Sequence, residues 1–151
     1  MLRWFATLLI LVVAFAAAWV RFSPNPPRAW AVDPLVAGRP HQPNGWLIRP
    51  EGGDMAAPVY RIPAPELATR LEEVALATPR TRLIAGSAAS GQMTFLTRSL
   101  IWGFPDFTSV KVLPLGEAST FAAYARARFG RSDFGVNKAR LLHWLAELSA
   151  P

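Results

Sequence analysis

Hydrophobic and polar positions alternate with two different periods along this chain, and each period predicts a kind of element. Apolar residues recur at helical spacing near 65–77 and again over 136–148, which predicts two amphipathic helices. The apolar stripes of these helices consist of Leu67, Leu71, Val74, Leu76, Leu141, Trp144, Leu145 and Leu148. Each helix therefore has one face to bury against another layer of structure.

Between the two predicted helices the apolar period falls to two, as in β-strands. The clearest case is 119–129, which places Phe121 and Ala123 on one face and Tyr124 on the other. The other predicted strands are 81–86, 92–99, 107–115 and an edge strand at 58–62. The order helix, strands, helix predicts an α+β domain, in which an antiparallel sheet of three to five strands has two flanking helices on one face.

The N-terminus carries a longer apolar run that has no period. Residues 4–20 contain no charge over seventeen residues, close to the roughly 17–25 that span a bilayer. We expect residues 1–21 to be a transmembrane anchor. The alternative is a cleaved signal peptide, for which Ala16–Ala18 would supply small residues at the cleavage site.

Proline sets the next boundary. Residues 22–57 contain the runs SPNPP and GRPHQPNG, and proline fixes φ and removes a backbone donor. This composition predicts an extended linker. The α+β domain is therefore expected to occupy residues 58–151.

Charge narrows the choice of partners. The formal net charge is +6, and residues 93–140 hold seven basic and three acidic residues. Clustered arginines favour an anionic partner. No nucleic-acid-binding motif is present, and an anchor argues against that class, so we expect no nucleic acid partner.

The sequence lacks the residues that several kinds of chemistry require. The chain has no cysteine, which excludes disulfides and thiol chemistry. Its two histidines, His41 and His143, lie far apart in sequence, and no zinc-protease or serine-hydrolase motif occurs. We therefore expect no catalytic residues, no metal and no cofactor.

One stretch resembles a known family. The residues RSDFGVNKAR, from Arg131 to Arg140, follow a basic and aromatic strand and precede the last helix. This arrangement resembles the bacterial domain of unknown function 1499 family, over roughly residues 58–148. The resemblance implies a cell-envelope setting and an α+β fold but no activity. Many family members carry a cysteine-containing segment before the domain, which this chain lacks.

The same stretch suggests two interpretations. Asp and Asn are preferred at helix starts, so the segment is interpreted first as a strand-to-helix junction, with Asp133 pairing to an arginine of the sheet. The second interpretation is an anion-binding site, because arginine forks bind carboxylate and phosphate. Its candidate residues are Arg98, Arg126, Arg128, Asp133, Asn137 and Arg140. The face that carries Arg126 and Arg128 would otherwise be the solvated side of the sheet.

Basic residues flank the apolar segment on both sides, so the positive-inside rule is nearly tied. Because short N-terminal anchors usually keep the N-terminus in the cytoplasm, we expect a single-pass protein of the cytoplasmic membrane, held by residues 4–20 with its soluble domain on the periplasmic side. The expected role is non-catalytic binding or scaffolding of an anionic small molecule, a lipid headgroup or an envelope protein. One alternative is a hydrolase-like enzyme that uses Asp106 or Asp133 in an arginine-lined pocket; another is a purely structural partner of a membrane complex. The aromatic loop 102–107 is expected to turn into the core rather than to form a membrane-facing tip.

Overall fold

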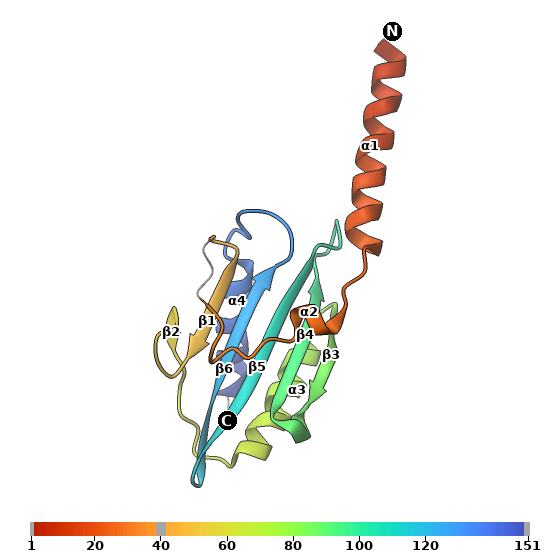
Figure 1. The fold of residues 1–151 in the computed structure, drawn as a ribbon. Helices are drawn as coiled ribbons and strands as arrows, with labels where there is room; N and C mark the ends of the chain where they lie inside the picture. Colours follow the sequence, from red (N-terminus) through yellow and green to blue (C-terminus); the bar gives the residue numbers. More distant parts are fainter. Residues whose placement is uncertain (1, 39–41, 150–151) are drawn as a thin grey trace.

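The centre of the protein is a six-stranded sheet, described here from a computed structural model that places residues 2–38 and 42–149. The strand order is β2-β1-β6-β5-β4-β3, and every neighbouring pair is antiparallel except β1 with β2 (Figure 1). The strands are β1 (Gly45–Arg49), β2 (Met55–Ala56), β3 (Thr81–Ser87), β4 (Gln92–Arg98), β5 (Pro105–Leu115) and β6 (Ala118–Ala127). The predicted α+β class is confirmed.

Two helices cover one face of this sheet. They are α3 (Ala64–Ala77) and α4 (Val136–Leu148), both close to their predicted bounds. A proline near the start of α3 suits the first turn, where its missing N–H has no helical partner in any case. The core between helices and sheet is formed by Ile48, Leu67, Leu71, Met93, Phe95, Val110, Phe121, Leu141 and Trp144.

The number of strands differs from the prediction of three to five. The segment 22–57, predicted as a linker, contributes β1, which pairs with β6 along four residues. This strand is buried on both faces, because Ile48 joins the core and Leu47 is buried on the opposite side. The prolines that suggested a linker lie outside the paired residues. The predicted edge strand at 58–62 is wrong, since only Tyr60 forms a bridge, to Ser119.

The face of the sheet opposite α3 and α4, called the outer face here, is also covered. Residues 23–37, called the crossing segment, run over it from β3 to β1 and include the short helix α2 (Pro27–Trp30) (Figure 1). The Trp30 ring stacks on Phe107 with centroids 3.9 Å apart. Polar side chains also hold the segment, through an ion pair from Lys111 to Asp33. The expectation that this side of the sheet is simply solvated is therefore wrong.

The N-terminal helix α1 (Leu2–Phe22) projects away from the sheet (Figure 1). Its stretch Arg3–Phe22 is long and apolar enough to cross a membrane, with a mean hydropathy of 2.2, and none of it is buried inside the protein. A helix this apolar on all sides is typical of a lipid environment. The crossing segment joins α1 directly to the sheet.

We predict that Trp30→Ala loosens the crossing segment. Removing a half-buried indole from its stack should lower the free energy of unfolding by about 2 kcal/mol and speed tryptic cleavage after Arg28. Urea unfolding and limited proteolysis of the full chain in detergent micelles measure both effects. Val36→Ala is the control, because Val36 is 83% exposed. Equal cleavage rates for both variants would contradict the role of Trp30.

Candidate functional site

The RSDFGVNKAR stretch forms the junction between β6 and α4. Phe134 and Gly135 have positive φ values of 54° and 80°, so the chain turns sharply just before α4. The Asp133 carboxylate closes this turn by accepting hydrogen bonds from the Gly135 amide and from the amide and side chain of Asn137, at 2.8–3.0 Å. A carboxylate at this position satisfies free N–H groups of the first helical turn.

The network continues from Asn137 into the sheet. Arg140 donates to the Asn137 side-chain oxygen at 2.7 Å and to the Asp106 carboxylate on β5 at 2.8 Å. The side chains of Arg140 and Asp106 are only 8% and 14% exposed. Burial raises the pKa of Asp106 even though the guanidinium of Arg140 acts in the opposite direction. This chain of contacts, called the motif network, comprises Asp106, Asp133, Asn137 and Arg140.

The motif network therefore has a structural role. Its members bond to one another and fix α4 against β5, as the junction interpretation expects. The pairing of Asp133 with an arginine of the sheet is wrong, because its oxygens are bonded to Gly135 and Asn137. Asp106 and Asp133 are not among the described residues that line the arginine-rich cavity described below.

Two of the other candidate residues hold the crossing segment. Arg126 donates to the Trp30 carbonyl at 2.8 Å, and its guanidinium lies over the rings of Trp30 and Tyr124. Burial lowers the pKa of Arg126. Arg128 donates to the Asn25 side-chain oxygen at 2.6 Å. Both arginines therefore bind this chain itself.

The remaining candidate, Arg98, lies in a different setting. It lines a shallow cavity of about 340 Å³ together with Arg21, Arg80 and Arg82, with apolar contributions from Leu96 and Leu100. We call Arg21, Arg80, Arg82 and Arg98 the arginine cluster. No aspartate or glutamate is among the described residues that line this cavity.

The sheet register brings these guanidiniums together. Arg82 lies opposite Leu96, two residues from Arg98 on the same face of β4. The Arg80 side chain donates to the Arg98 carbonyl, and Arg98 donates to the Gly103 carbonyl at 2.7 Å. Burial lowers the pKa of Arg98, and repulsion by Arg82, Arg21 and Arg128 lowers it further. The cluster is therefore a concentration of positive charge without a matching carboxylate in its cavity.

Sequence reasoning found one member of this cluster and missed three. Arg82 carried a usable signal, because the hairpin of two predicted strands at 81–98 places it on the same face as Arg98. Arg80 precedes that hairpin with a positive φ of 60°. Arg21 carried no signal, because only the path of the crossing segment brings the end of α1 to this edge of the sheet.

The structure offers no alternative metal centre within residues 2–38 and 42–149, where no group of three or more His, Asp or Glu side chains is suitably placed. His143 lies on the exposed side of α4 beside Glu147. His41 falls outside the described residues.

Fold and site together define a class of protein: an α+β domain with an apolar N-terminal helix and an arginine-lined cavity where the two meet. Residues 36–148 match the family described as Protein of unknown function (DUF1499), and the chain belongs to this family. The match begins inside the segment predicted as a linker, where the crossing segment and β1 lie. No curated protein and no solved structure matches the chain.

We predict strong coupling between Asp106 and Arg140. Removing either partner leaves a buried charge unpaired, so Asp106→Ala and Arg140→Ala should each lower the free energy of unfolding by about 3 kcal/mol. The double variant should lose much less than the sum of the two. Urea unfolding of the four proteins measures the cycle. Additive losses would show that the pair does not act as a unit.

The raised pKa of Asp106 predicts a pH dependence. The folded protein binds the Asp106 proton more tightly than the unfolded chain does. This proton therefore contributes its whole stabilisation of the fold below the ordinary pKa of 3.8, and the contribution is lost as pH rises through the raised pKa. The stability of the parent relative to Asp106→Asn should therefore fall as pH rises above the ordinary pKa of 3.8. Unfolding of both proteins at several pH values tests the sign, and a rising difference would contradict it.

Proposed function

We propose that this protein is a membrane-anchored, non-catalytic binding module of the bacterial cell envelope, and that the arginine cluster holds a phosphate-type anion at the membrane surface. The observation that carries this proposal is the meeting of four arginines around one cavity, with no carboxylate among the lining residues that the structure describes. Anchoring by α1 in the cytoplasmic membrane, with the domain on the periplasmic side, is part of the proposal.

Electrostatics favours an anion at this place. Like charges disfavour one another, and the lowered pKa of Arg98 has the three neighbouring arginines among its causes. A bound phosphate would reverse that repulsion and accept several charge-assisted hydrogen bonds from planar guanidinium groups. The Arg82 side chain is exposed and lines the cavity, so its donors are accessible to a ligand.

The position of the arginine cluster along the membrane normal supports a ligand at the membrane surface. Arg21 directly follows the apolar residues of α1, so in a bilayer-spanning helix it lies at the level of the lipid headgroups. The other three arginines line the same cavity and therefore lie at the same level. The phosphate of an anionic lipid and a soluble phosphate ester share the chemistry that this cavity would recognise.

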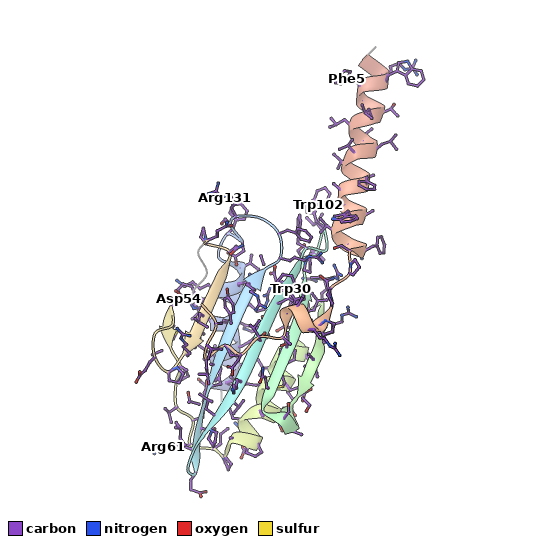
Figure 2. All side chains as sticks on the ribbon, viewed as in Figure 1. Phe5, Trp30, Asp54, Arg61, Trp102 and Arg131 are labelled. Atoms are coloured by element: carbon purple, nitrogen blue, oxygen red, sulfur yellow. The ribbon has the colours of Figure 1, made fainter. Side chains whose placement is uncertain are left out.

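We predict that Arg82→Glu weakens phosphate binding by tenfold or more, since a charge-assisted hydrogen bond contributes about 1.5–3 kcal/mol. Arg61→Glu is the matched control, because it changes the net charge equally at the end of the domain opposite α1 (Figure 2). One arm titrates glycerol phosphate into the full chain in uncharged micelles, followed by calorimetry. The other counts phosphatidylglycerol molecules retained by the chain from mixed nanodiscs, using native mass spectrometry.

The two arms separate the possible sources of the anion. Retention of phosphatidylglycerol that Arg82→Glu abolishes and Arg61→Glu preserves would identify a lipid headgroup. Binding of glycerol phosphate with the same dependence, and no lipid retention, would identify a soluble ester. Equal behaviour of the two variants in both arms would overturn the proposal.

A further inference from the structure

We propose that the loop between β4 and β5, residues 99–104, inserts into the membrane beside α1 as a second membrane contact. This inference rests on the anchor of the proposed function but not on its anion. The loop has the sequence Ser-Leu-Ile-Trp-Gly-Phe and lies at the end of the domain from which α1 leaves (Figures 1 and 2). Its apolar side chains are exposed, Ile101 by 78% and Trp102 by 48%, so the expectation that the aromatic residues of this loop turn into the core is wrong for Trp102.

The loop lies alongside the membrane helix. Trp102 and Phe104 face Val13, Ala16, Ala17 and Val20 of α1 across an apolar cavity. These four positions form one stripe of the helix, spaced by three and four residues. Gly103 lies so close that a Cβ there would be 3.1 Å from the Arg21 guanidinium. Loop and helix therefore share a position along the membrane normal.

At this shared position the loop lies at the depth of the bilayer when α1 spans it. Residues 13–21 of an α-helix cover about 13 Å, and the apolar run 4–20 covers about 25 Å against a hydrocarbon core of about 30 Å. If the loop lay in water, the facing residues of α1 would lie there too. Only residues 4–12 would then remain in lipid, a length of about 13 Å that cannot span. When α1 spans the bilayer, the loop therefore lies in the membrane as well.

Hydrogen bonding limits the depth of insertion. The loop closes on itself, because the Ser99 amide donates to the Phe104 carbonyl at 3.0 Å and the Phe104 amide donates to the Ser99 hydroxyl at 2.9 Å. Within the described part of the chain, the peptide groups of residues 100–102 form no backbone hydrogen bonds, and unpaired peptide groups are costly in hydrocarbon. The loop backbone therefore lies near the interfacial layer, where Gly103 is close to Arg21, while the Trp102 and Phe104 side chains face the apolar stretch Val13–Val20 of α1.

The neighbouring loop supplies further groups suited to a membrane surface. The β6–α4 loop lies at the same end of the domain, where Figure 2 labels Arg131. Phe104 contacts Phe129 of this loop at 6.3 Å between ring centroids, which joins the two loops. Phe134 is 95% exposed there. Aromatic and basic side chains at one end of a domain match the polarity of a membrane interface.

Site-directed spin labelling tests the insertion directly. The chain has no cysteine, so single cysteines can be labelled in the full protein without further changes. Leu100→Cys and Ile101→Cys report on the loop, Leu9→Cys reports on the anchor, and Glu117→Cys reports on the exposed turn at the opposite end (Figure 1). Each label is compared in phosphatidylcholine vesicles for collisions with oxygen, which enters lipid, and with a water-soluble nickel chelate.

The proposal expects the ratio of oxygen to nickel collisions at 100 and 101 to be several-fold higher than at 117 and closer to that at 9. A ratio at both loop positions equal to that at 117, with 9 in lipid, would place the loop in water and overturn the inference while leaving the anchor intact. Labels shielded from both reagents would show protein covering the loop and would also overturn it. Water exposure at 9 would refute the anchor and the inference with it. Because the vesicles carry no net charge and no soluble phosphate ester is added, the experiment tests the loop without the anionic lipid or phosphate ester proposed for the arginine cluster.

Discussion

The stacking of Trp30 on Phe107 is the contact on which the rest of the architecture depends. It covers the outer face of β5, and it holds the Trp30 carbonyl where Ser109 and Arg126 can donate to it. The sheet is consequently buried on two faces by very different material: helices on one side and a proline-rich segment on the other. By holding that segment, the same contact also sets where α1 leaves the domain and hence which arginines meet at its end.

The stretch of sequence that marks the family and the surface with the most concentrated positive charge lie in different parts of the molecule. Aspartate, asparagine and arginine in a short motif are also the residues that cap a helix and anchor it to a sheet, and here they bond to one another. The arginine cluster, by contrast, comprises residues without a motif from three separate parts of the chain. A family signature can therefore mark what keeps the fold together, while the surface that meets a ligand depends on how distant segments are brought together.

The sequence predicted α3, α4 and four of the strands because each is marked by a local pattern, either an apolar stripe at helical spacing or a strand-like run bounded by turn residues. It did not predict β1, which has five residues and whose partner β6 lies far along the chain, so neither length nor local turn chemistry marked it. The same limit applies to the site. Arg98 and Arg82 share a hairpin and were within reach of local reasoning, whereas Arg21 joins them only through the non-local packing of the crossing segment.

The prolines of the crossing segment were interpreted as the mark of an extended linker, but the segment is held against the sheet. A free tether would let the domain sample a wide volume around its anchor, with low effective concentration for any one target. With residues 23–37 fastened to the sheet, little slack remains between α1 and the domain. With α1 anchored in a bilayer as proposed, the domain would stay at a fixed distance from the membrane, close to the lipids of its own leaflet and away from more distant targets. Any soluble partner would have to come to the membrane.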